Sequence, residues 1–243
     1  MKQYGLIGYP LTHSFSKKYF EEKFTRENIS GSSYGLFPIS DIHQFPQLLN
    51  NNPGLCGLNV TIPYKEAVIP YLNEMDTAAI ETGAVNCIKI NGGRLKGYNT
   101  DIYGFEISLK HFLAHKPEQA FVLGSGGSAK AIVYVLKKLS LPYVQVSRQR
   151  VLGFLSYSQI ESYLQPSNLF INCTPLGMFP EVNACPGIPY QKLSKSDYLF
   201  DLVYNPVQTL FLKKGAEMGA NIKNGEEMLA VQAEKSWEIW YTG

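Results

Sequence analysis

A glycine-rich turn in the second half of the chain has the residue types and spacing that bind a nucleotide phosphate. The turn consists of Gly124, Ser125, Gly126, Gly127, Ser128 and Ala129. It follows an apolar strand-like stretch and opens an expected helix, the context that the dinucleotide fingerprint requires. The first glycine permits the tight turn, the second lets the backbone approach a pyrophosphate, and the alanine lets helix and strand pack closely. Free amides and the helix dipole then face the anion. We predict dinucleotide binding, the alternative being a simple connecting turn.

The end of the next expected strand indicates which dinucleotide binds. An Asp or Glu about 20 residues beyond the turn would bind the ribose 2′-hydroxyl of NAD, but residues 119–160 contain no acidic side chain. The strand end instead carries Ser147, Arg148 and Arg150. Guanidinium groups suit a 2′-phosphate, so the sequence favours NADP over NAD. The competing interpretation is that both arginines are ordinary exposed loop residues.

The first hundred residues offer polar groups for a small substrate, each with an ordinary structural alternative. Ser14 and Ser16 place two hydroxyls at an expected helix start, which suits a carboxylate or plain helix capping. Thr61 is expected to cap a helix with Pro63 in its first turn. Lys65 would then lie in that first turn, where the helix dipole disfavours a cation, although surface lysines are common.

Three further polar residues are ambiguous when taken singly. Asp101 is well placed as the N-cap of a helix that continues with Ile102 and Phe105. Asn86 could be a strand-end amide with satisfied hydrogen bonds. Gln232 lies on a fairly apolar helix face, where a buried amide needs partners from the protein or from a ligand.

The elements that must position these residues follow from hydrophobic periodicity. In the first half we expect strands over 3–8, 32–38 and 55–60, a helix over 16–27, a short helical stretch ending near 50–53, and a hairpin over 85–90 and 94–98. In the second half we expect strands over 121–123, 143–147, 169–173 and 199–203, and helices over 128–139, 209–218 and 226–240. Strands alternating with helices predict a parallel, doubly wound sheet.

Composition excludes several classes of protein. The chain has 243 residues, 45% of them apolar, and a formal charge of +2, so a globular fold is expected, with no nucleic-acid or membrane partner. No secretory signal is apparent, which predicts a cytoplasmic protein. The four cysteines lack metal-ligand spacing and are expected to be reduced thiols. His111 and His115 are four residues apart but have no third ligand nearby, so no metal is expected.

Taken together, the motifs closely resemble the shikimate dehydrogenase family in order and along nearly the whole chain. They are Gly-x-Pro-x-x-His-Ser-x-Ser (8–16), Asn-Val-Thr-x-Pro-x-Lys (59–65), Gly-Ala-Val-Asn (83–86), Gly-x-Asn-Thr-Asp (97–101), the glycine turn, Asn-Cys-Thr-Pro-Leu-Gly-Met (172–178), Asp-Leu-Val-Tyr-Asn-Pro (201–206) and Gln-Ala (232–233). The resemblance implies reversible NADPH-dependent reduction of 3-dehydroshikimate to shikimate in aromatic amino-acid biosynthesis. It implies an α/β substrate-binding and catalytic domain of residues 1–101 plus 226–243, and a Rossmann-like NADP domain of residues 102–225.

The same resemblance implies a role for each matching residue. Lys65 and Asp101 would be the catalytic pair, and Ser14 and Ser16 would hold the substrate carboxylate. The ring hydroxyls would bind Thr61, Asn86, Asp101 and Gln232, with Tyr204 near the substrate. The cofactor would contact the glycine turn, Ser147, Arg148, Thr174, Val203, Gly225 and Met228. Whether Lys65 donates the proton or acts as an electrostatic group stays open, as does the choice between monomer and homodimer.

Departures from the family pattern concentrate at the adenosine end. The usual Asn-Arg-Thr is Ser147-Arg148-Gln149 here, and the segment to Ser158 is shortened, so we expect a reduced helix there. Cys87 stands where a threonine is usual. Two alternatives remain: a quinate/shikimate dehydrogenase with relaxed cofactor use, and a non-catalytic sensor of a dinucleotide or shikimate-like metabolite on the same fold.

Overall fold

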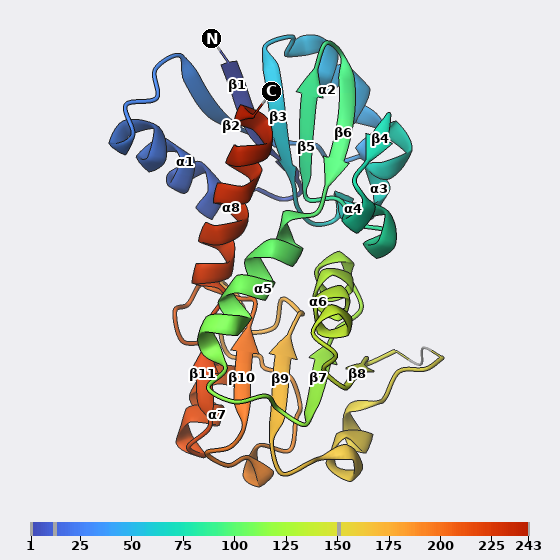
Figure 1. Cartoon of the computed structure of the whole chain (residues 1–243), viewed down its shortest axis with the longest axis vertical. Coiled ribbons are helices and arrows are strands. Elements are labelled where there is room, and N and C mark those ends of the chain that lie inside the picture. The colour runs from blue at the N-terminus through green and yellow to red at the C-terminus, as the bar shows by residue number, and fades with distance from the viewer. Residues whose placement is uncertain (1, 12–13, 150–151, 243) are drawn as a thin grey trace. The chain divides into compact units, whose positions relative to one another are not determined.

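The computed structural model describes residues 2–11, 14–149 and 152–242, which fold into two compact units (Figure 1). Unit 1 comprises Met1–Gly104 and Leu229–Gly243, and unit 2 comprises Phe105–Met228. The chain passes into unit 2 within α5 (Thr100–Phe112) and returns within α8 (Glu226–Tyr241). The chain therefore crosses between the units within two helices.

Unit 1 is built on a mixed sheet with the strand order β2-β1-β3-β5-β6-β4. Its strands are β1 (Lys2–Gly8), β2 (Ser32–Pro38), β3 (Leu55–Val60), β4 (Glu74–Met75), β5 (Cys87–Asn91) and β6 (Arg94–Tyr98). β1 runs parallel to β2 and β3, whereas β5 is antiparallel to β3 and β6. The turn between β5 and β6 has positive φ at Gly92 and Gly93, the backbone that favours glycine in a tight hairpin. The expected hairpin is therefore confirmed.

Helices cover both faces of this sheet because its strands alternate apolar side chains between them. On one face, α1 (Phe15–Arg26) and α8 bury an aromatic cluster that includes Tyr4, Phe20 and Trp237. On the other face lie α2 (Phe45–Asn51), α3 (Tyr64–Ala67) and α4 (Thr77–Thr82), with the short 3₁₀ turns η1 (Ile42–Gln44) and η2 (Ile69–Tyr71). A Cβ at Gly57 would lie 2.4 Å from the Trp240 ring, so the absence of a side chain there lets α8 lie close against β3.

The described residues of unit 2 form five parallel strands in the order β11-β10-β9-β7-β8. They are β7 (Gln119–Leu123), β8 (Tyr143–Val146), β9 (Asn168–Asn172), β10 (Tyr198–Asp201) and β11 (Asn221–Lys223). Its helices are α6 (Gly127–Lys138), α7 (Leu210–Glu217), η3 (Tyr157–Tyr163) and η4 (Tyr190–Lys192). The sheet builds outward from β7 in both directions, so the carboxyl end of β7 lies at the switch point where such folds bind ligands. The doubly wound, Rossmann-like prediction is confirmed.

Some elements differ from the sequence expectation. The short elements β4, α4 and β11 were not expected, because two to six residues carry too little periodicity to read. Between β8 and β9 the described residues form the 3₁₀ turn η3 rather than an α-helix, in agreement with the shortened segment expected there. Within the described ranges, no helix combines the length and the apolar character needed to cross a membrane.

Candidate active site

A largely buried lysine–aspartate ion pair lies in unit 1. Lys65 Nζ donates to Asp101 Oδ2 at 2.6 Å, and both side chains are largely buried. Lys65 lies on α3, a helix of only four residues. The expected cap at Thr61 is wrong, because Pro63 is the N-cap and the Thr61 carbonyl accepts the Tyr64 N–H instead. So short a helix has little dipole, and the partner carboxylate governs the environment of the ammonium group.

Asp101 reaches the lysine because it is not a helix cap. The expected N-cap role is wrong: α5 begins at Thr100, which places Asp101 inside its first turn. The Asn86 side chain caps the helix instead, since its Oδ1 accepts the Thr100 N–H at 2.6 Å. Asn86 Nδ2 also donates to Asp101 Oδ1 at 2.8 Å. The two carboxylate oxygens are thus held separately, one by Lys65 and one by Asn86.

Gln232 completes this polar cluster from α8. Its side chain is 5% exposed, and its Oε1 lies 3.3 Å from both Asn86 Nδ2 and Thr100 Oγ1. One amide proton goes to the Leu229 carbonyl at 3.1 Å. The structure therefore brings Lys65, Asn86, Asp101 and Gln232 together from four separate segments.

The hydroxyls expected to hold a carboxylate occupy different roles. Ser14 is the N-cap of α1, and its hydroxyl oxygen accepts the Lys17 N–H at 3.2 Å. The helix-capping alternative is therefore confirmed for Ser14. The Ser16 side chain hydrogen-bonds to Tyr34, and burial raises the pKa of that phenol well above its usual value. The neighbouring motif residue His13 lies outside the described residues.

Thr61 lies where two parallel strands end. It follows β3, and its N–H donates to the Ile7 carbonyl at 2.9 Å. A Cβ at Gly8 would lie 2.4 Å from the Thr61 methyl group, so the two strand ends are in contact.

Also in unit 1, Lys23 of α1 forms an ion pair with Glu234 of α8 at 2.8 Å. This pair holds the helix that carries the serines to the helix that carries Gln232.

The glycine turn of unit 2 has the backbone that a pyrophosphate site needs. Gly124 follows β7 with φ +123°, a conformation that favours glycine. Gly126 is the N-cap of the 12-residue helix α6, has no side-chain cap, and has open space where a Cβ would stand. Ala129 is fully buried against the sheet. An open turn at a helix N-terminus fits a dinucleotide phosphate.

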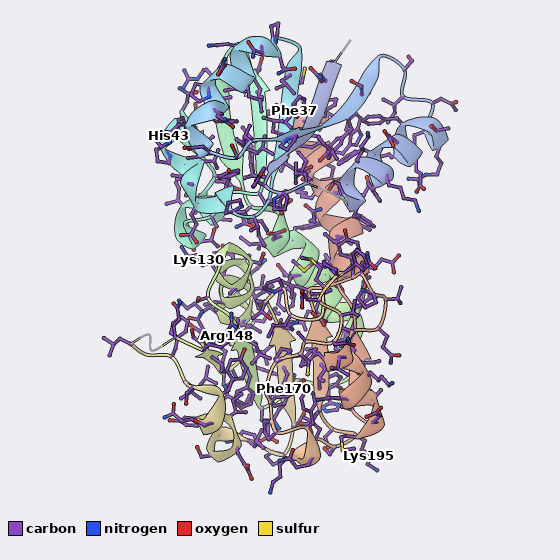
Figure 2. The ribbon with its side chains drawn as sticks, turned by 180° about the vertical axis from the view of Figure 1, so that it is seen from behind. Phe37, His43, Lys130, Arg148, Phe170 and Lys195 are labelled. Atoms are coloured by element: carbon purple, nitrogen blue, oxygen red, sulfur yellow. The ribbon has the colours of Figure 1, made fainter. Side chains whose placement is uncertain are left out.

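Ser147 and Arg148 lie at the neighbouring strand end. They follow β8, whose last residue, Val146, accepts the Gly124 N–H at 2.9 Å. Arg148 is exposed (Figure 2), and Ser147 Oγ accepts the Gln149 N–H at 3.1 Å. This places the arginine one strand from the phosphate turn, as a 2′-phosphate contact requires. The second arginine of the motif, Arg150, lies outside the described residues.

The remaining cofactor candidates gather at the same carboxyl edge of the sheet. Thr174 donates to Asn172 Oδ1 at 2.6 Å and packs beside Gly124. The Val203 carbonyl accepts the Gly225 N–H at 3.3 Å, and a Cβ at Gly225 would lie 2.3 Å from a backbone oxygen, so only glycine fits. The neighbouring residues are Met228, which is buried, and Tyr204, which is half-buried.

A buried carboxylate, Asp201, ties these loops together. Its Oδ1 accepts from Asn172 Nδ2 at 2.9 Å and from the Val203 N–H at 3.0 Å, while Oδ2 accepts from Thr209 Oγ1 at 2.5 Å. Burial raises the pKa of Asp201 to about 6, although the three hydrogen bonds act in the opposite direction and lower it. The carboxylate thus links the segments that follow β9 and β10.

The raised pKa of Asp201 predicts a pH-dependent stability. A carboxyl with a raised folded-state pKa contributes stability below its unfolded value near 3.8, and that contribution is lost as the pH rises through about 6. Relative to Asp201→Asn, the wild-type free energy of unfolding should fall by up to about 3 kcal/mol between pH 4 and pH 7. Urea unfolding of both proteins across this range measures the difference, and parallel pH profiles would show that Asp201 does not titrate there.

Sequence reasoning missed three polar residues that support the cluster of unit 1. Asn59 and Thr100 lie inside the motifs but were given no role, and Ser236 lies outside every motif. All three are almost fully buried. The available signal was spacing, because Ser236 follows Gln232 by four residues and so shares its face of α8. No group of three or more potential metal ligands occurs in the described part of the chain.

Comparisons with known proteins give relatives along almost the whole chain. A family model described as the shikimate dehydrogenase substrate binding domain matches residues 6–88. A curated shikimate dehydrogenase (NADP(+)) of Caldanaerobacter subterraneus subsp. tengcongensis is 34% identical over 263 residues, covering 98% of this chain and 91% of the relative.

Solved structures of shikimate dehydrogenases are also similar to this chain over nearly its whole length. A crystal structure of a shikimate dehydrogenase in complex with NADP⁺ has a TM-score of 0.87 at 29% identity, covering 99% of this chain and 90% of the other. The shikimate 5-dehydrogenase of Thermus thermophilus, in complex with NADP(H) and shikimate, has a TM-score of 0.82 at 27% identity, covering 99% and 93%. The likeness therefore extends over both units.

Proposed function

The chain belongs to the shikimate dehydrogenase family, and from this membership we propose which of its residues carry the reaction. The reaction is the reversible NADPH-dependent reduction of 3-dehydroshikimate to shikimate, a step of aromatic amino-acid biosynthesis. The observation that carries the proposal is the Lys65–Asp101 pair, with Asn86 hydrogen-bonded to Asp101 and the Gln232 side-chain oxygen 3.3 Å from Asn86 Nδ2. It combines a cation with amide and carboxylate groups suited to a polyhydroxylated ring.

Lys65 provides the positively charged group next to the substrate carbonyl. During reduction, negative charge develops on the substrate carbonyl oxygen, and an ammonium group next to it can stabilise that charge and donate the proton. Asp101 Oδ2 orients the ammonium, while its other oxygen is fixed by Asn86. In the reverse direction the same pair accepts the proton from the shikimate hydroxyl. NADPH, when bound, supplies the hydride.

The substrate is held by residues of unit 1. Ser14 and Ser16, at the start of α1, bind its carboxylate through their hydroxyls. Thr61, Asn86, Asp101 and Gln232 bind the ring hydroxyls, and Tyr204 is proposed as a further substrate residue. Support comes from the position of Asn86, Asp101 and Gln232 in one polar cluster, where Asn86 Nδ2 lies 2.8 Å from Asp101 Oδ1 and 3.3 Å from Gln232 Oε1.

The cofactor is held by residues of unit 2. The turn of residues 124–129 binds the pyrophosphate, and Ser147 and Arg148 bind the adenosine 2′-phosphate. Thr174, Val203, Gly225 and Met228 line the nicotinamide site. Support comes from their common position at the carboxyl edge of a parallel sheet. We also propose a cytoplasmic location, which the four free cysteines support because disulfides are rare in that compartment, and a monomeric or homodimeric state.

Initial-rate absorbance at 340 nm tests this function. Purified protein is assayed with shikimate or quinate as substrate, each with NADP⁺ or NAD⁺. We expect clear preference for shikimate with NADP⁺. Comparable rates with quinate or NAD⁺ would identify the broader quinate/shikimate class. Shikimate binding without turnover would identify a sensor instead.

Replacing Arg148 with alanine tests the 2′-phosphate contact. We expect the KM for NADPH to rise at least about tenfold and the KM for NADH by less than about twofold, because only NADPH loses a charge-assisted hydrogen bond. Lys195→Ala is the matched control: this exposed cation precedes β10 and so lies at the opposite edge of the sheet from Arg148 (Figure 2). Equal weakening of both cofactors would exclude Arg148 as the group that recognises the phosphate.

A further inference from the structure

A network of buried hydrogen bonds lies behind the substrate-binding amides of unit 1. Its central members are Asn59, Thr100 and Ser236, which are 4%, 2% and 0% exposed. Asn59 Nδ2 donates to Ser236 Oγ at 2.9 Å, and Thr100 Oγ1 lies 3.1 Å from the same oxygen. Ser236 is thus the point at which β3, α5 and α8 are joined through side chains.

Counting protons along the shortest contacts assigns each donor. Asn86 Nδ2 has two protons, and its shortest contacts are Asp101 Oδ1 at 2.8 Å and Thr100 Oγ1 at 3.0 Å. Ser236 donates its single proton to the Gln232 backbone carbonyl at 2.9 Å. The Ser236 oxygen therefore acts as an acceptor toward Thr100.

The acceptor that the Thr100 hydroxyl proton takes decides whether Gln232 Oε1 already accepts a hydrogen bond within the protein. Its three acceptors are Ser236 Oγ at 3.1 Å, Asn86 Oδ1 at 3.2 Å and Gln232 Oε1 at 3.3 Å. Asn86 Oδ1 already accepts the Thr100 N–H at 2.6 Å. With Ser236 accepting the hydroxyl proton, neither Asn86 nor Thr100 donates to Gln232 Oε1.

We propose that Ser236 is a positioning residue: by accepting the Thr100 proton, it leaves the Gln232 side-chain oxygen available to accept a hydrogen bond from a ring hydroxyl of the substrate. Ser236 does not touch the substrate in this scheme and acts through Gln232. The inference rests on the proposed function, since it concerns the polyol that Gln232 binds.

Ser236→Ala tests the proposal by removing the acceptor. The Thr100 proton then turns to Gln232 Oε1 and competes with the substrate hydroxyl. We expect the Kd for shikimate, measured by calorimetry without cofactor, to rise about fivefold, the effect of one ordinary hydrogen bond. KM for shikimate should rise in parallel, with kcat within about twofold of wild type.

A double-mutant cycle separates this role from general support of the fold. Gln232→Met has similar length but no acceptor oxygen, so Ser236→Ala should change the shikimate Kd by less than about twofold in that background. An undiminished fivefold effect in the Gln232→Met background would overturn the proposal, because Ser236 would then act by another route. An unchanged Kd in the single variant would overturn it too.

Two controls keep the test decisive. Ser167→Ala removes another buried, hydrogen-bonded serine, in unit 2, and should lower Tm without changing the shikimate Kd. If Ser236→Ala does not fold, Ser236→Cys supplies the same cycle with a weaker acceptor of similar shape. Failure of the wild-type protein to bind shikimate would refute the proposed function itself, whereas normal wild-type binding with no effect of Ser236 refutes only this inference.

Discussion

Replacing Lys65 with alanine will lower kcat by about 10²–10⁴-fold and leave the KM for shikimate within about threefold. The ammonium group acts mainly where charge develops on the substrate oxygen, so its loss removes stabilisation of the transition state rather than of the bound substrate. Steady-state rates with shikimate and NADP⁺ measure both parameters, and thermal melting shows that the variant is folded.

Lys65→Arg distinguishes proton donation from electrostatic stabilisation. Arginine keeps the positive charge but does not release its proton in the accessible pH range. If Lys65 donates the proton, Lys65→Arg should be nearly as slow as Lys65→Ala, and if it acts only by charge, Lys65→Arg should recover much of the rate. Lys18→Ala is the matched control, because that lysine is exposed on α1. A Lys65→Ala variant with wild-type kcat would remove Lys65 from the mechanism.

Replacing Asp101 with asparagine will lower kcat by about 10²–10³-fold, and it will also raise the KM for shikimate. Asp101 accepts from Lys65 at 2.6 Å and from Asn86 at 2.8 Å. An asparagine can satisfy only one of these donors with its oxygen, and its amide would face the other. The ammonium group then loses its orientation, and the hydroxyl contact assigned to the carboxylate weakens.

Glu106→Gln provides the matched control for this change. Glu106 also lies on α5, is largely buried and pairs with Lys110 and Lys138, each at 2.7 Å. Its neutralisation should cost stability without a large loss of kcat. In the double variant Lys65→Ala, Asp101→Asn, the two losses in kcat should be far from additive, since the residues act as a unit. Fully additive losses would show that they act independently.

Much of the architecture could be predicted from local patterns. The strand before the glycine turn, the helix after it and the hairpin around Gly92 and Gly93 all appear where periodicity and turn residues place them. Failures occurred where an element is too short to show a period, as at β4 and β11, or where a polar side chain has a distant partner. The caps illustrate the second case, because Asn86, and not Asp101, satisfies the first N–H of α5.

The sequence by itself determined the family and the reaction, because spaced motifs record which residue types the chemistry requires, and it predicted Lys65 and Asp101 as the catalytic pair. Only the tertiary structure decided how these residues are connected. Asn59, Thr100 and Ser236 come from separate segments. Their contacts with one another, and the 3.3 Å approach of Thr100 Oγ1 to Gln232 Oε1, require elements far apart in the chain to come within hydrogen-bonding distance. Linear spacing does not encode such distances, since they depend on how the sheet and its helices pack.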